Sequence, residues 1–471
     1  MATARFADYV DRDAQNHGMP LRFTFPPHTV VGKPRATLRQ YVEGNDQVTG
    51  EPLMQKVINV LTGPASHDGF QPGIRKTPWP RLLKPDTEGN LRRLFLESGW
   101  TDGLPIILPT EERVAEMLTG TSHPPDEVVG QMTITTNQEK LEYTVEKVAV
   151  NAVMAGARPE HLPVILAIAS TQEPSCPSST TSFARMILVN GPIRNEIGMN
   201  SGVGALSPFN LANSVIGRAW TLMTINLGDT RLGETFMGSQ GSNLNYNNMC
   251  AAENEELSVW EPFHVQKGFR PGESTVSLFR GWSVINSMGA PNRRPAHEET
   301  AILLKAFPAL RSTATLIMDP LVAKHLKDSQ GFKTKEELGK WLSENVKIPA
   351  KQYWDADLVY AFILPLALEG VEPYASWYKL PQDAMLAPYN EPNNINVVVV
   401  GGETNPLWQT TDFFYTQTAS VDKWRPQSGS SQATRSRRPE PGSVASCESG
   451  ECEISRPTEV GGISSGVSLI C

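Results

Sequence analysis

Four consecutive valines, Val397 to Val400, restrict the fold of this chain more than any other feature. They end the run INVVVV, and Gly401 and Gly402 follow them. A strand that is apolar at every position is covered on both faces, which is typical of sheets that are at least partly parallel. The runs ARMILVN and ATLIMD are also predicted strands. We therefore predict an α/β fold with a mixed, partly parallel sheet that helices flank.

Helical patterns alternate with these strands. The clearest helix begins after Thr144, a good N-cap, and ends at Gly156. Pro159 opens a second helix through LPVILAIAS, and Gly228 stops the long run FNLANSVIGRAWTLMTINLG. Two further helices are predicted at LVAKHL and TKEELGKWLSENV.

The body is predicted to span residues 91–425, as two lobes near 91–290 and 291–425. Residues 1–90 are rich in proline, glycine and basic side chains, and only the stretch from Leu53 to Leu61 is helical in pattern, so we expect an irregular extension that wraps over the body. Its predicted anchors are four aromatic residues, Phe23, Phe25, Phe70 and Trp79. Residues 426–471 are mostly serine, glycine, proline and charged residues, without any aromatic one, so we expect a disordered tail.

Composition excludes several classes of protein. The net charge of -8 offers no positive field for a phosphate backbone, so nucleic acid is not an expected partner. No run reaches the roughly 20 apolar residues of a membrane-spanning helix, and the first residues lack the basic and then apolar order of a secretory signal. Five cysteines in 471 residues do not make a disulfide scaffold. We expect a cytoplasmic protein with a small-molecule substrate.

A polar, glycine-rich loop follows the predicted strand ARMILVN. In parallel sheets ligands bind beyond the carboxyl ends of the strands, so the loops after Asn190, Met318 and Val400 are candidate sites. Backbone amides of the glycine-rich loop, with the start of the next helix, suit an anion or a carboxylate; the alternative is a tight connection without a ligand. Arg194 and Arg218 flank this loop and could bind a carboxylate or belong to ion pairs. The predicted substrate-binding residues are Arg194, Asn200, Gly202, Gly204 and Asp102, the last in a turn near Trp100.

Cys250 stands in the acidic run NNMCAAENEE, with His264 fourteen positions later. If this run is helical, Cys250 and Glu253 share one face. Nearby carboxylates raise the pKa of a thiol above its free value of about 8.5, so a nucleophilic Cys250 needs His264, an arginine or a divalent metal beside it. The predicted catalytic residues are Cys250, Glu253, Glu256 and His264, and a metal would take Cys250, Glu253 and His264 as ligands. The alternative is a buried, inert cysteine.

Motifs for nucleotide cofactors are absent from the sequence. It contains neither a dinucleotide fingerprint nor a Walker loop, and it lacks a G-x-S-x-G nucleophile elbow. A divalent metal therefore remains as an open alternative for a cofactor.

Several long runs resemble a bacterial family that accompanies, or is fused to, small thioredoxin-like proteins with a Cys/Sec-Gly-Ser-Cys motif. In order, these runs are GWTDGLPIILPTEERVAEML, TVEKVAVNAVMAGARPEHLPVILA, NGPIRNEIGMNSGVGALSPFNLANSVIGRA and MCAAENEELSVWEPFHVQKGF, and the resemblance covers residues 91–405. It implies thiol or selenol chemistry and a thioredoxin-like redox partner. The matching residues are Asp102, Gly103, Glu146, Asn151, Asn200, Gly202, Cys250, Glu253, Glu255, Glu256, Trp260, Glu261 and His264. The chain departs from the family in its N-terminal extension and in a cysteine-containing tail without that motif.

Two functions from different classes fit the sequence. The first is a cysteine-centred enzyme with thiol redox or lyase-type chemistry on a small molecule that is anionic or bears a thiol. In this hypothesis the tail cysteines, Cys447, Cys452 and Cys471, act as a swinging dithiol that exchanges with Cys250. The alternative is a binding or carrier protein, whose tail thiols hold a soft metal or a thiol adduct.

Overall fold

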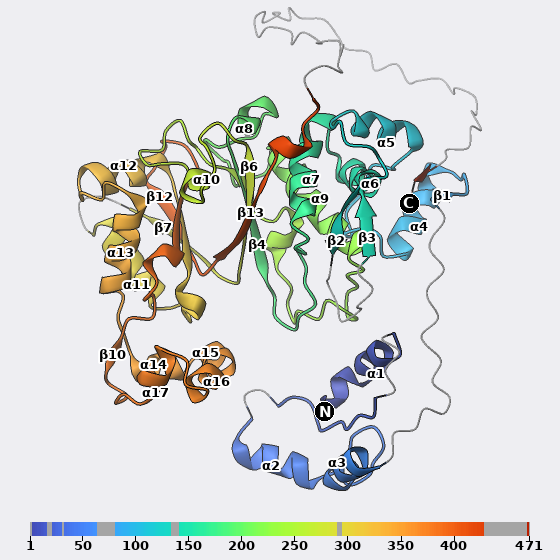
Figure 1. Cartoon of the computed structure of the whole chain (residues 1–471), viewed down its shortest axis with the longest axis vertical. Helices are drawn as coiled ribbons and strands as arrows, with labels where there is room; N and C mark the ends of the chain where they lie inside the picture. Colours follow the sequence, from blue (N-terminus) through green and yellow to red (C-terminus); the bar gives the residue numbers. More distant parts are fainter. Residues whose placement is uncertain are drawn as a thin grey trace, which may run out of the picture.

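The body consists of four layers, with helices, two sheets and helices again from one side to the other (Figure 1). The computed structural model describes residues 2–16, 21–30, 33–63, 81–132, 141–289, 294–427 and 469–470. The α/β class and the mixed pairing of strands are as the sequence predicts, although eight strands of the body form two four-stranded sheets instead of one.

Each sheet has four strands and one parallel pair. The first sheet has the order β13 (Phe414–Ser420), β6 (Thr275–Gly281), β4 (Ala184–Asn190) and β5 (Cys250–Ala252), in which β4 and β5 are parallel. The second has the order β11 (Ile395–Val399), β8 (Ala314–Met318), β12 (Leu407–Thr411) and β7 (Val284–Met288), in which β11 and β8 are parallel. The buried strand predicted from the valine run is β11, and every one of its residues is buried.

The alternation of side chains along the strands builds three cores. On β11, Val398 faces the first sheet, whereas Val397 and Val399 face the helices on the other side. On β4, Leu188 likewise faces the second sheet and Val189 the helices. Apolar side chains at every position of these strands are needed because both faces are covered.

Two groups of helices cover the outer faces of the sheets. The first sheet packs against α6 (Val145–Ala155), α7 (Leu162–Ser170) and α9 (Leu211–Leu227), and the second against α11 (Ala296–Leu304), α12 (Pro320–Asp328) and α13 (Lys335–Asn345). As predicted, Thr144 caps α6 by accepting a hydrogen bond from the Lys147 amide. Gly156 ends that helix with φ of 85°, a left-handed conformation that suits glycine. The remaining helices of the body are α4 (Glu88–Glu97), α5 (Glu111–Leu118), α8 (Ile193–Glu196) and α10 (Phe263–Gln266), and β2 (Val128–Met132) pairs with β3 (Leu141–Thr144).

The chain passes twice between the sheets. It leaves β6 for β7 at Gly281, where a Cβ atom would lie 2.2 Å from the ring of Phe413. Asp412, on the returning passage, accepts hydrogen bonds of 2.8 Å from the amides of Trp282 and Ser283. β7 precedes the predicted boundary near residue 290 but belongs to the second sheet, and β13 follows that boundary but belongs to the first sheet. Each of the two predicted lobes therefore contributes one strand to the sheet of the other.

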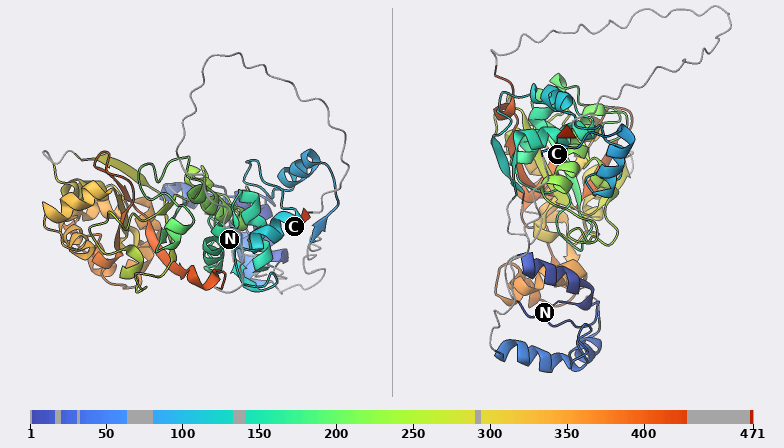
Figure 2. Two further views of the ribbon diagram at one scale, coloured as in Figure 1. Left: turned by 90° about the horizontal axis from the view of Figure 1, so that it is seen from above. Right: turned by 90° about the vertical axis from the view of Figure 1, so that its right-hand side faces the viewer.

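Two small helical units lie beneath the body (Figures 1 and 2). The first, with β9 (Ile348–Pro349) and β10 (Met385–Leu386), contains α14 (Ala350–Trp354), α15 (Asp357–Phe362), α16 (Leu364–Leu368) and α17 (Tyr374–Tyr378). The second contains α1 (Ala7–Asn16), α2 (Arg35–Glu43) and α3 (Leu53–Thr62). The N-terminal region is irregular as expected, but its described residues include α1 and α2 besides the expected α3.

Asp46 organises this N-terminal unit. Its buried carboxylate accepts hydrogen bonds from the amides of Phe25, at 2.7 Å, and Thr49, at 2.9 Å, and from Lys56 at 3.0 Å. Burial alone would raise the pKa of Asp46, but these hydrogen bonds outweigh it and hold the pKa well below its usual value. Phe25 is buried inside this unit, and the centre of its ring lies 6.0 Å from that of Phe23. The remaining predicted anchors, Phe70 and Trp79, lie outside the described residues.

The chain end returns to the body through a short strand, β14 (Leu469–Ile470), which pairs antiparallel with β1 (Leu82–Leu83). The predicted disordered tail otherwise lies outside the described residues from residue 428 onward. Within the described part of the chain, no helix combines the length and apolarity needed to cross a bilayer.

Candidate functional site

The carboxyl ends of the parallel strands of both sheets meet at one edge of the body. The amide of Asn254, just after β5, donates a 2.7 Å hydrogen bond to the carbonyl of Val399 at the end of β11. The amide of Gly401 in turn donates to the carbonyl of Ser201, in the glycine-rich loop, at 2.8 Å. The structure therefore brings together the loops after β4, β5 and β11, near α8 at the top of Figure 1. The polar side chains gathered there form what we call the edge cluster: Asn190, Arg194, Glu253, Glu255, Glu256, His264 and Lys335.

Glu253 is the anchor of the edge cluster. It is fully buried, and one carboxylate oxygen pairs with the buried Lys335 ammonium group at 2.9 Å. The other oxygen accepts hydrogen bonds from the Asn190 side chain, at 2.6 Å, and from the Phe263 amide, at 2.7 Å. These partners come from β4, α10 and α13, so Glu253 joins the two halves of the body. A carboxylate so fully occupied does not fit the predicted role of proton donor or acceptor.

Arg194, on α8, is the buried cation of the cluster. Its Nε atom donates to the Gly191 carbonyl at 3.0 Å, and Nη1 donates to the Glu253 carbonyl at 2.7 Å. The outer side of the guanidinium group binds both carboxylate oxygens of Glu256, at 3.2 and 3.0 Å. The hydrogen bonds from Arg194 lower the pKa of Glu256 to about 2, although partial burial opposes this. Just over half of the Glu256 side chain is exposed, so this pair faces solvent on one side.

Glu255 and His264 lie deeper. One oxygen of Glu255 accepts hydrogen bonds from the Gly191 amide, at 2.8 Å, and from Asn190, at 2.9 Å. The same oxygen lies 3.9 Å from Nδ1 of His264, which is fully buried. Neither ring nitrogen of His264 has a hydrogen-bond partner among the described residues, and the same holds for Asn190 Oδ1 and Thr275 Oγ1. Asn190 and Thr275 are direct neighbours across β4 and β6, so buried polar atoms without partners gather on this side of the cluster.

Cys250 does not join the edge cluster. The predicted helix at this residue is wrong: Cys250–Ala252 is β5, so Cys250 and Glu253 do not share a helix face. Cys250 is 1% exposed and belongs to the apolar core between the first sheet and its helices. Burial strongly raises the pKa of its thiol, although the Gly217 backbone opposes this. The geometry favours the alternative of an inert cysteine, and Cys176, also buried with a raised pKa, is no better placed.

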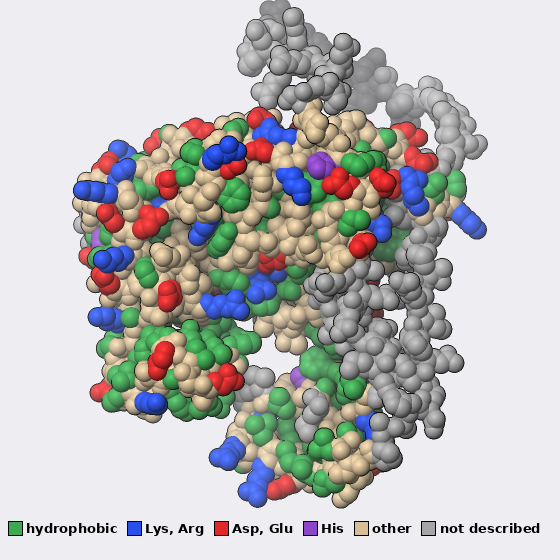
Figure 3. Space-filling view, viewed as in Figure 1, with side chains coloured by type: hydrophobic (Ala, Val, Ile, Leu, Met, Phe, Trp, Pro, Cys, Tyr) green, Lys and Arg blue, Asp and Glu red, His purple; other side chains and the backbone are tan. Residues whose placement is uncertain are grey.

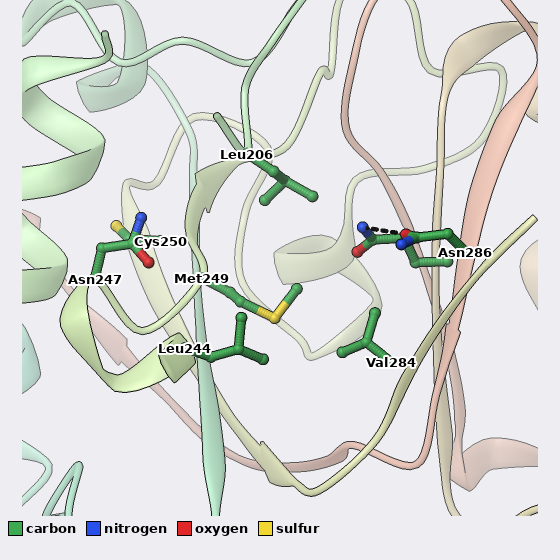
Figure 4. A pocket seen from close by; sticks show the side chains of 8 residues that line it. Leu206, Leu244, Asn247, Met249, Cys250, Val284 and Asn286 are labelled. Carbon is green, nitrogen blue, oxygen red and sulfur yellow. Dashed lines mark hydrogen bonds between the residues drawn. The ribbon is translucent and has the colours of Figure 1, made fainter. Parts of the chain in front are cut away.

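A cavity of about 250 Å³ lies between the two sheets near the start of β5 (Figure 4). Its lining residues are Leu206, Leu244, Asn247, Met249, Cys250, Val284, Asn286 and Gln409. In Figure 4 the sulfur of Cys250 points away from the centre of this cavity, whereas Met249 points into it. Asn248 and Met249 have left-handed backbones, with φ of 50° and 40°, which for a residue such as Met is a strained conformation. No charged side chain lines this cavity.

The predicted anion site in the glycine-rich loop is filled by the loop itself. The Asn200 amide donates to the Asn213 side chain, and the Gly202 amide donates to the Asn200 side chain at 2.9 Å. The Gly204 carbonyl accepts from Ser207 and Asn210. The alternative of a tight connection therefore describes Asn200, Gly202 and Gly204 better than a ligand site.

Asp102 lies in a separate ion pair. Its carboxylate binds the guanidinium group of Arg218 at 2.7 and 2.9 Å, and Arg218 also donates to the Pro105 carbonyl. This pair fixes α9 to the segment before α5. Of the two alternatives left open for Arg218, the structure shows the ion pair, and Asp102 has no contact with the edge cluster among the described residues.

The proposed metal ligands are not brought together. In the part of the chain that the structure describes, no group of three or more His, Cys, Asp or Glu side chains could hold a metal ion. Cys250 faces α9, whereas Glu253 is engaged by Lys335 and His264 stands beside Glu255. The tail thiols of Cys447, Cys452 and Cys471 lie outside the described residues.

Two members of the edge cluster escape sequence reasoning. Asn190 ends a predicted strand, a position that could have identified it, because polar residues there face the ligand edge. Lys335 lies 82 positions from Glu253, and no local pattern connects the two. No protein-family model, curated protein or solved structure matches the chain.

Proposed function

We propose that the protein is an enzyme that moves a proton on a small carboxylate-bearing molecule at the edge cluster, in a reaction of the lyase type. This keeps the anionic substrate expected from the sequence and transfers the chemistry from Cys250 to His264. The observation that carries the proposal is the fully buried imidazole of His264, whose two nitrogens lack hydrogen-bond partners among the described residues. A buried polar atom without a partner costs about 1–3 kcal/mol, and such atoms are often retained for a chemical role.

In the proposed reaction Arg194, His264 and Glu255 have separate roles. The substrate carboxylate takes the place of Glu256 on the outer side of Arg194, where a guanidinium fork suits two oxygens. His264 accepts a proton from the carbon beside that carboxylate, and the electron pair left behind enters the carboxylate as an enolate. Glu255, 3.9 Å from Nδ1, stabilises the charged ring and acts as a positioning residue. The proton then returns to carbon, or the enolate expels a leaving group from the next carbon.

Hydrogen exchange tests this without knowledge of the natural substrate. The protein is incubated in deuterium oxide with acetate, malonate, succinate, malate and aspartate separately, and loss of the carbon-bound proton is followed by NMR. We expect exchange in at least one compound, loss of exchange in His264→Asn, and tighter carboxylate binding in Glu256→Gln because the internal competitor is weakened.

The matched control is Glu88→Gln, which removes one partner of an exposed Arg–Glu pair on α4 and leaves the edge cluster intact. A thermal melt of each variant establishes that it folds. Exchange with none of the five compounds, or exchange that persists in folded His264→Asn, contradicts the proposal.

A further inference from the structure

A second charged site lies at the opposite end of the first sheet from the edge cluster. Arg280, near the end of β6, stands between two aromatic rings, with its guanidinium carbon 4.9 Å from the centre of the Phe183 ring and 4.8 Å from that of Phe414. Phe183 also packs against Trp282, at 4.9 Å between ring centres. Stacking occupies the faces of a guanidinium group and leaves its in-plane N–H donors free for an anion. The Nε atom of Arg280 is buried and has no partner among the described residues.

Arg311 approaches the same place from the second half of the body. Its guanidinium carbon lies 5.4 Å from the centre of the Phe414 ring, so two cations share one ring. The backbone that carries it is strained: Ala309, Arg311 and Ser312 have φ of 48°, 58° and 55°. The Asn394 side chain holds this backbone by donating to the Arg311 carbonyl at 3.1 Å. Strained backbone that its surroundings hold in place is typical of binding sites.

The local charges do not balance. Across the sheet Arg280 is paired directly with Arg185, and Arg185 is neutralised by an ion pair with Glu173. Among the described residues, neither Arg280 nor Arg311 forms an ion pair or donates a hydrogen bond from its guanidinium group. Burial lowers the pKa of Arg280, Glu173 opposes this, and the charge of Arg311 adds to the lowering. Among these interactions, the three arginines Arg185, Arg280 and Arg311 accompany a single carboxylate, Glu173. Figure 3 shows that Lys and Arg side chains also occur on the surface of the lower part of the body.

We propose that Arg280 and Arg311, with the rings of Phe183, Trp282 and Phe414, form a binding site for a small phosphate monoester that carries an aromatic group. Two uncompensated positive charges match the charge of a phosphate monoester, which is about -1.5 to -2 at pH 7. The free guanidinium donors suit its oxygens, and the half-buried aromatic rings leave apolar surface for an aromatic group to contact. The site is independent of the edge cluster and of the function proposed for it.

Calorimetric titration of the full chain with phenyl phosphate tests this inference. Methyl phosphate, which has the charge without the ring, and benzoate, which has the ring with a single charge, are the comparison ligands. We expect one site, with phenyl phosphate bound more tightly than either. Arg311→Gln and Arg280→Lys should each weaken phenyl phosphate about tenfold or more, since a hydrogen bond to a charged group is lost in each.

Arg92→Gln is the matched control, because it removes an exposed arginine that pairs with Glu88 on α4. It should leave the affinity for phenyl phosphate unchanged. Equal affinity for benzoate and phenyl phosphate would contradict the phosphate, and equal affinity for methyl and phenyl phosphate would contradict the aromatic group. Binding that persists in folded Arg311→Gln and Arg280→Lys would overturn the site.

Discussion

Removal of the Lys335 ammonium group should destabilise the body more than any surface ion pair does. Lys335 and Glu253 are buried, 3% and 0% exposed, and their charged atoms lie 2.9 Å apart. At an effective dielectric constant of about 20, this distance corresponds to about 6 kcal/mol of attraction. The amide donors of Asn190 and Phe263 still stabilise the carboxylate in Lys335→Met, so we expect a loss of about 3–5 kcal/mol in the free energy of unfolding.

The measurement is urea unfolding at pH 7, followed by circular dichroism, for Lys335→Met, Glu253→Gln and the double variant. The double variant should lose at least about 2 kcal/mol less free energy of unfolding than the two single variants lose together, because the second substitution removes the charge that the first leaves unpaired. Lys351→Met is the control, since Lys351 pairs with Asp355 on the surface with both side chains mostly exposed, and it should cost less than about 1 kcal/mol. Equal costs for Lys335→Met and Lys351→Met would refute the reasoning.

Three further predictions concern neighbouring features. Glu256→Gln should lower the free energy of unfolding by about 1 kcal/mol at pH 7, allowing for solvent screening. Because the pKa of Glu256 is lowered to about 2 in the folded protein, this difference should be complete above the unfolded pKa of 4.5 and should disappear as the pH falls to about 2. Unfolding at several pH values measures it. Gly217→Ala should cost about 3 kcal/mol by urea unfolding, since its Cβ would lie 1.8 Å from a main-chain oxygen, whereas Gly89→Ala, with open space around it, should not destabilise. Cys250 should resist Ellman's reagent in the folded protein and react after unfolding, and rapid modification of the native thiol would contradict its burial.

The local sequence pattern correctly predicted the helices and strands that bury apolar faces in the body. The helices α6 and α9 and the strands β4, β8 and β11 lie where capping residues and apolar runs place them. The local sequence pattern did not predict β5, because Cys-Ala-Ala followed by acidic residues has no β-propensity of its own. The strand forms because its backbone pairs in parallel with β4 in the middle of the protein. Tertiary pairing there overrides the helical preference of alanine.

The error at Cys250 follows from that single assignment. Along a strand, neighbouring side chains point to opposite faces. Met249 consequently faces the space between the sheets, while Cys250 faces the helices. The sequence identified the correct segment, since Glu253, Glu255, Glu256 and His264 do gather, but it could not assign the face. Partners distant in the chain, such as Lys335, depend on the packing of α13 and not on any local pattern.

The proposed function requires the edge cluster to exchange Glu256 for a ligand on Arg194 without unfolding the body. Two hydrogen bonds of Arg194 bind the main-chain carbonyls of Gly191 and Glu253, and these hold the guanidinium group at the ends of β4 and β5. Only its outer donors bind Glu256, a half-exposed side chain on a loop. In the proposed function an incoming carboxylate displaces Glu256 and leaves these buried bonds in place, together with the 3.2 Å ion pair between Nε and Glu255. The affinity for a ligand then depends on the difference in free energy between the ion pair of Arg194 with the ligand and that of Arg194 with Glu256. Glu256→Gln should therefore strengthen ligand binding even though it slightly destabilises the fold.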